Sequence, residues 1–112
     1  MVDPHAVHME RVAEAVLRTP GDLDSGVRDA IEARAAELGG RESGPGPEVP
    51  EDLRAYVEKV ARHAYKVIDG DVEELRAAGY SEDAIFEATL ASALGAARSR
   101  LERGLAAVEA LD

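Results

Sequence analysis

Three side chains near the middle of the chain have the types and spacing that acid–base chemistry needs: His63, Tyr65 and Asp69. A histidine close to a carboxylate can take up or release a proton near neutral pH, because the ordinary pKa of imidazole is about 6.5. A tyrosine nearby can donate a hydrogen bond. We therefore predict these three residues as candidate catalytic groups.

Charged neighbours of this cluster are candidate ligand-binding groups: Glu58, Lys66 and Asp71. On a helix, residues three or four apart share one face, so helical spacing would place Lys66 beside both His63 and Asp69. An alternative stays open. The same charges are also typical of the polar flank of an amphipathic helix, where they form ordinary surface pairs.

Neither a metal site nor a cofactor site is predicted. The acidic run that begins at Asp69 suggests calcium, but an EF-hand loop needs Gly at its sixth position and Glu at its twelfth, where this chain has Glu74 and Tyr80. The chain has no cysteine, which excludes thiolate nucleophiles and thiolate metal ligands. No Gly-rich phosphate loop follows a strand.

Composition limits the classes of partner. The 112 residues carry 23 acidic and 13 basic side chains, a net charge of −10, which argues against nucleic acid and against an anionic membrane surface. The absence of cysteine and of a signal peptide favours a cytoplasmic protein.

Apolar residues recur at helical spacing, and no alternating run predicts a strand, so we predict an all-α fold of about five helices. A pair of helices is expected within residues 1–38, the second from Asp24 or Ser25 to Leu38, followed by a Gly/Pro loop at 39–49. In 50–112 we expect a helix from Pro50 whose apolar stripe reaches Val67, a short helix over 71–78, and a long helix capped by Ser81. The whole chain is expected to form one domain.

Two faces are predicted on the long C-terminal helix. Apolar residues step by three or four along one face: Phe86, Leu90, Leu94, Ala97, Leu101, Leu105 and Val108. A second face holds only small side chains: Ala88, Ser92, Gly95, Ala96 and Ser99. Small side chains let another helix approach closely, and that helix could belong to the same chain or to another subunit.

The segment from Val49 to Leu111 resembles the carboxymuconolactone decarboxylase and alkylhydroperoxidase D-like family. The resemblance lies in Tyr56–Val67, in Asp71–Glu87, and in the alanine-rich helix that follows. Its most recognisable part is a short helix that ends at Gly79, followed by a Ser-Glu-Asp start of a long helix.

The resemblance implies an all-α fold that assembles into trimers or hexamers. Redox members carry a Cys-x-x-Cys pair and a histidine, which would fall near Ala64, Val67 and Asp71, so the cysteine-free chain is not expected to be a thiol peroxidase or reductase. Other members act on lactones by proton transfer, and the resemblance would place His63, Tyr65 or Asp69 at the family's cavity.

Two functions follow as hypotheses. The first is a cysteine-free carboxymuconolactone decarboxylase-like protein that performs acid–base chemistry on a small metabolite or binds one. The second is a non-catalytic oligomer that binds a ligand or another protein.

Overall fold

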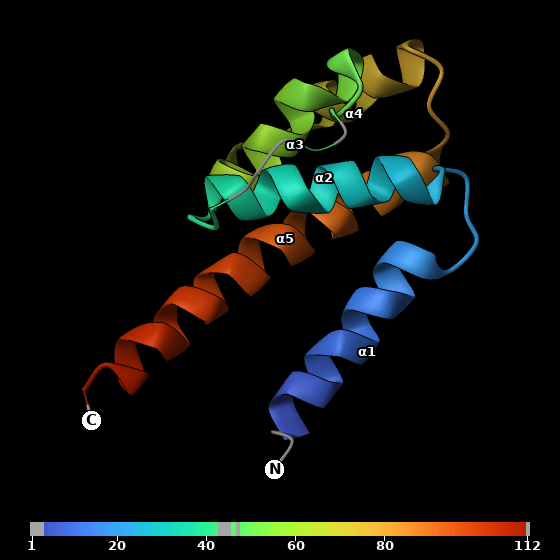
Figure 1. Cartoon of the computed structure of the whole chain (residues 1–112). Helices are drawn as coiled ribbons and strands as arrows, with labels where there is room; N and C mark the ends of the chain where they lie inside the picture. Colours follow the sequence, from blue (N-terminus) through green and yellow to red (C-terminus); the bar gives the residue numbers. More distant parts are fainter. Residues whose placement is uncertain (1–3, 43–45, 47, 112) are drawn as a thin grey trace.

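The chain is built from helices. The computed structural model describes residues 4–42, 46 and 48–111, and within them it has five α-helices, one 3₁₀ turn and no strand. The helices are α1 (Pro4–Arg18), α2 (Ser25–Leu38), α3 (Glu51–His63), α4 (Asp69–Ala77) and α5 (Glu82–Glu109), with the 3₁₀ turn η1 (Ala64–Lys66) between α3 and α4. The predicted all-α class and the long C-terminal helix are confirmed (Figure 1).

The closest helix pair is α2 on α5, and small residues make it possible. Gly95 and Ala35 lie where the two helices meet, and both are buried. A Cβ atom at Gly95 would overlap the carbonyl oxygen of Glu32 and come within 3.0 Å of the Ala35 Cβ. The small-residue face of α5 therefore packs within this chain, which decides between the two possibilities left by the sequence.

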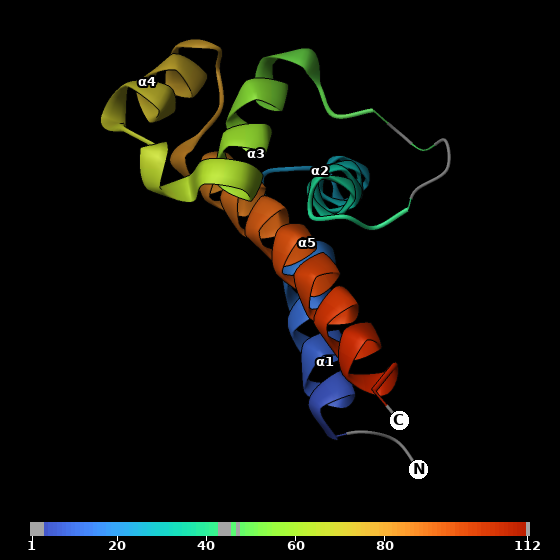
Figure 2. The ribbon, with the colours of Figure 1, turned by 90° about the vertical axis from the view of Figure 1, so that its left-hand side faces the viewer.

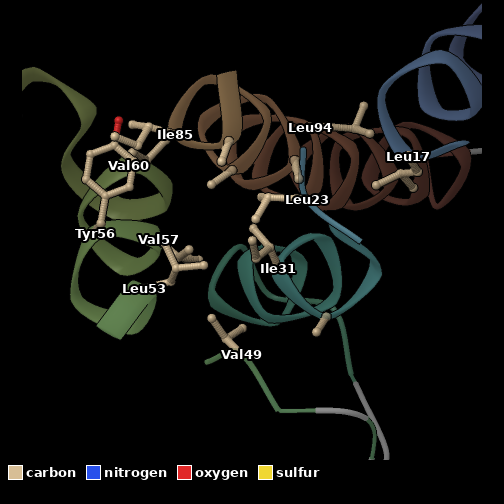
Figure 3. Packing of buried hydrophobic residues seen from close by; sticks show 14 of the residues in the cluster. Leu17, Leu23, Ile31, Val49, Leu53, Tyr56, Val57, Val60, Ile85 and Leu94 are labelled. Carbon is tan, nitrogen blue, oxygen red and sulfur yellow. The ribbon is translucent and has the colours of Figure 1, made fainter. Parts of the chain in front are cut away.

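The apolar core joins both halves of the chain. Leu53 and Val57 of α3 face Ile31 of α2, while Leu17 of α1 lies near Leu94 of α5 (Figure 3). The buried Ser92 hydroxyl donates a hydrogen bond of 2.8 Å to the Val57 carbonyl, which joins α5 to α3. The predicted N-terminal helix pair thus belongs to the same core as the segment that follows it.

Two charged side chains hold the connection between α1 and α2. The buried guanidinium of Arg28 donates hydrogen bonds to the carbonyls of Val16 and Thr19, at 3.0 and 2.6 Å, and so satisfies the C-terminal end of α1. The Glu87 carboxylate accepts the backbone N–H groups of Asp22 and Leu23. Together they fix where α1 leaves the core.

The third helix is shorter than predicted. Its apolar pattern continues through Ala64 to Val67, but α3 ends at His63, whose backbone (φ −145°, ψ 56°) leaves the helical region. The Arg100 guanidinium donates a hydrogen bond to the Ala61 carbonyl in the last turn of α3. α4 begins at Asp69, two residues earlier than predicted, and the predicted turn at Gly79 is confirmed by its φ of +105°.

The second half of α5 extends beyond the core. Residues 100–109 of this helix are all exposed, and the first turn of α1 lies at the same end of the molecule as the last turn of α5 (Figure 2). The radius of gyration is 14.8 Å, whereas a compact chain of this length has about 13 Å. We call residues 100–111 the α5 tail.

Gly95 offers a test of the close α2–α5 crossing. We expect Gly95→Ala to lower the free energy of unfolding by about 1–3 kcal/mol, because the new methyl group meets backbone that cannot turn aside. Gly26→Ala in α2 is the matched control, since its Cβ would have no neighbour closer than 3.7 Å. Urea denaturation followed by circular dichroism measures both; equal stability of the two variants would contradict the close crossing.

Tyr80 offers a second test, because it links the segment before α5 to α3. Its hydroxyl donates a hydrogen bond of 2.5 Å to Asp52, and burial, followed by that carboxylate, raises the pKa of Tyr80 to about 12. The raised pKa means that stability gained from the neutral phenol is complete below about pH 10 and is lost as the pH rises towards 12. We expect Tyr80→Phe to remove this part of the alkaline loss in urea titrations. An equal loss of stability at high pH in Tyr80→Phe and in the unmodified chain would contradict this role of the Tyr80–Asp52 hydrogen bond.

Candidate functional site

Two of the three predicted catalytic groups, His63 and Tyr65, lie at the surface where α3 ends and η1 begins. The rings of His63 and Tyr65 meet edge to face, with centroids 5.9 Å apart, and Lys66 Nζ lies 5.9 Å from the Tyr65 ring. His63 is exposed, and the Tyr65 side chain is 81% exposed. The three residues therefore meet around an aromatic ring in contact with solvent.

The expected arrangement of these residues on one helix face is wrong. Because α3 ends at His63, Lys66 belongs to the 3₁₀ turn η1 and Asp69 opens α4. Asp69 is exposed at the start of that helix, where a carboxylate interacts favourably with the helix dipole. The structure thus brings His63, Tyr65 and Lys66 together and leaves Asp69 on another element.

Glu58 and Asp71, two of the predicted ligand-binding residues, form ion pairs within the chain. Glu58 accepts a hydrogen bond of 2.8 Å from Arg34 of α2, an interaction that raises the pKa of Arg34. Asp71 lies 3.0 Å from Lys59 Nζ through both carboxylate oxygens. The turn after α3 brings Asp71 of α4 next to Lys59 of α3.

Asp71 also caps the start of α4. It accepts the Ile68 backbone N–H at 2.9 Å, and this hydrogen bond, followed by the Lys59 contact, holds the pKa of the Asp71 carboxyl below its ordinary value. A carboxylate used in this way joins α3 to α4. These contacts give it a structural role.

A shallow groove of about 350 Å³ lies between α1 and α5, away from all six predicted site residues. It is lined by Glu10, Ala13, Glu14, Leu17, Arg18 and Arg98. Arg98 bridges Glu10 of α1 at 3.1 Å and Glu32 of α2 at 3.5 Å. Arg98 and Glu10, two of the charged residues that line the groove, thus form ion pairs that hold α1, α2 and α5 together.

The same ionic network reaches the α5 tail. Arg41, which follows α2, pairs with Glu32 at 3.2 Å and with Glu102 at 2.8 Å. The hydrogen bond from Arg41 is the main reason that the pKa of Glu102 lies below its ordinary value. The first turn of the tail is therefore tied to the end of α2.

Among residues 4–42, 46 and 48–111, no cluster of three or more His, Asp or Glu side chains is placed to hold a metal ion. In the same part of the chain, no helix combines the length and apolar character that crossing a bilayer requires.

An exposed apolar stripe runs along α5 and the residues that follow it, and we call it the α5 stripe. It consists of Leu90, Ala97, Leu101, Gly104, Leu105, Val108 and Leu111, all exposed. The exposed fractions rise from 38% at Leu90 to 63% at Val108 and 85% at Leu111. The sequence pattern revealed most of these residues but did not show that the helix would bury its small-residue face and leave this one open.

Comparison with known proteins identifies no relationship: no family model matches this chain, and neither does any curated protein or solved structure. Membership of the family that the sequence resembles stays a prediction.

The Asp71–Lys59 contact predicts a pH-dependent contribution to stability. Because the folded-state pKa of Asp71 is lowered, the contribution is present above the ordinary carboxyl pKa of about 3.9 and is lost as the pH falls through the folded-state value. We expect Asp71→Asn to be less stable than the unmodified chain at pH 7 and the difference to shrink below about pH 4.

Urea denaturation at several pH values measures this difference. Asp69→Asn is the matched control, since it removes a carboxylate from the same helical turn without touching the Lys59 contact. An equal loss in both variants would mean that the helix dipole, rather than the ion pair, explains the effect.

Proposed function

We propose that this chain is a non-catalytic helical module that associates with itself through the α5 stripe. The observation that carries the proposal is the exposure of large apolar side chains on a regular helix: Leu101, Leu105 and Val108 are 44%, 50% and 63% exposed. A continuous apolar stripe of this kind on a helix is typical of a surface that another helix covers.

The extent of the exposed surface supports association. The chain exposes 7303 Å², about 1,350 Å² more than the roughly 5,950 Å² expected for a compact monomer of 11.9 kDa. A standard protein interface buries about 800 Å² per partner, so the surplus leaves room for one.

The α5 tail also lacks the packing that stabilises the rest of the helix. In proteins, most helix stability comes from tertiary packing of an apolar face. The tail leaves its buried contacts after Ser99, and near its beginning Arg100 bonds to the Ala61 carbonyl and Glu102 pairs with Arg41. Covering the stripe with another helix would supply the missing packing.

Charge does not oppose pairing at this surface. The chain as a whole carries −10, but between Leu90 and Leu111 it has three arginines and only two glutamates. Two copies that meet through this part of α5 therefore bring together a slightly basic segment of an acidic protein. Repulsion between the acidic parts is weakened by distance and by salt.

The acid–base hypothesis receives less support. A general base works best where neighbouring groups and burial tune it and where water is excluded. His63 and Tyr65 instead lie on an exposed turn, and Glu58 and Asp71 are neutralised by Arg34 and Lys59. Three suggestions from the sequence stay predictions: assembly into a trimer or hexamer, a small-molecule ligand, and a cytoplasmic location.

A charge placed on the stripe should disrupt association. We expect Leu105→Glu to weaken self-association by about 100-fold or more, because each copy loses roughly 1.5–3 kcal/mol of apolar burial and gains a charge at the contact. Sedimentation velocity over a range of concentrations measures the effect, and circular dichroism verifies that the helices persist.

The neighbouring substitution Ala106→Glu is the matched control. Ala106 is exposed one residue along α5, where the helical turn of 100° per residue points it away from the stripe. Association that is absent in the unmodified chain, or that both variants weaken equally, would overturn the proposal.

A further inference from the structure

We propose that the partner of the α5 stripe is α5 of a second copy, running antiparallel, with Ala97 of each copy opposite Val108 of the other. This inference rests on the proposed self-association and adds its geometry. It follows from the order of large and small residues along the stripe.

The α5 residues that could form a seam recur in a heptad pattern. Starting at Leu90, apolar residues follow at intervals of 4, 3, 4, 3, 4 and 3: Leu94, Ala97, Leu101, Gly104, Val108 and Leu111. This is the spacing of a helix that pairs with another along a narrow seam. Leu94 already packs against the core, so the free part of the seam runs from Ala97 to Leu111.

Large and small residues alternate along that free part. Ala97 and Gly104 are small, and Leu101 and Val108 between and after them are large. A Cβ atom built at Gly104 would meet nothing within 4 Å, so the space in front of this glycine is open. Each small residue is a hole that a large side chain can fill.

Direction decides whether the large residues meet these holes. In a parallel pair, identical positions face each other, so Leu101 would meet Leu101 and Gly104 would meet Gly104, which leaves a gap. In an antiparallel pair centred between Glu102 and Arg103, Leu101 faces Gly104 and Val108 faces Ala97. Each of the four layers between positions 97 and 108 then combines one large and one small side chain, which close packing of helices 8–10 Å apart favours.

The flanking charges agree with the same register. Arg98 would lie opposite Ala107 of the second copy, and Arg100 opposite Leu105, so the arginines of the two copies do not face each other. Their long aliphatic stems can cover apolar surface while the guanidinium groups stay in water. An antiparallel centre near residue 102 therefore avoids like-charge contacts.

Single cysteines test the register, because the natural chain contains none. Ala97→Cys and Val108→Cys are made separately, mixed, and oxidised under conditions in which the unmodified chain is a dimer. Both positions are exposed in one copy, and circular dichroism verifies that each variant keeps its helices. We expect a disulfide between the two different variants to be the predominant product.

The distance between the two cysteines distinguishes an antiparallel pair of helices from a parallel one. In the antiparallel register, two cysteines at position 97 lie about 16 Å apart along the helix axis, beyond the roughly 7 Å that a disulfide spans between Cα atoms. Ala106→Cys, on the opposite side of α5, gives the background of chance collisions.

Each outcome decides something. Predominant disulfides between identical variants would overturn the antiparallel register and leave self-association standing. Mixed disulfides no more frequent than the Ala106→Cys background, in a chain that still dimerises, would place the contact elsewhere. A chain that is monomeric at every concentration would overturn the proposed function together with this inference.

Discussion

The close crossing of α2 and α5 at Gly95 is the constraint on which the rest of the structure depends. Because backbone of α2 occupies the space where a Cβ would stand, α5 must turn its small-residue face inward. The large apolar residues lie on another side of the same helix, so most of them are left facing outward. The packing that stabilises the fold and the surface proposed for association are therefore two consequences of one helix rotation.

Much of the fold could be predicted because local signals mark it. Ser81 accepts a hydrogen bond from the Ala84 N–H as a helix cap, and Gly79 adopts a positive φ. The end of α3 carries no such signal: no Gly or Pro stands near His63, and the apolar pattern continues past it. Periodicity shows which residues share a face of a helix but not which face finds a partner, so the exposure of the α5 stripe required the structure.

The candidate site shows how a sequence cluster can separate in space. Six polar residues between positions 58 and 71 suggested one chemical centre, but a break in the helix after His63 divides them among three elements. Arg34, distant in sequence, pairs with Glu58, and Lys59 pairs with Asp71. Such partners come from tertiary packing, and spacing along one helix cannot reveal them. The ion pairs that stabilise the fold therefore engage the carboxylates of Glu58 and Asp71, which the sequence suggested for ligand binding.

Two different kinds of interaction hold the two parts of α5. Up to Ser99 the helix is buried among small and apolar side chains, and at Glu102 an ion pair with Arg41 continues the attachment. The lowered pKa of Glu102 means that this attachment is present at neutral pH and is lost on acidification. Beyond it the tail presents exposed leucine and valine side chains. Apolar side chains gain free energy by leaving water, so the proposed association would stabilise the last turns of α5 more than the first turns, which the core already covers.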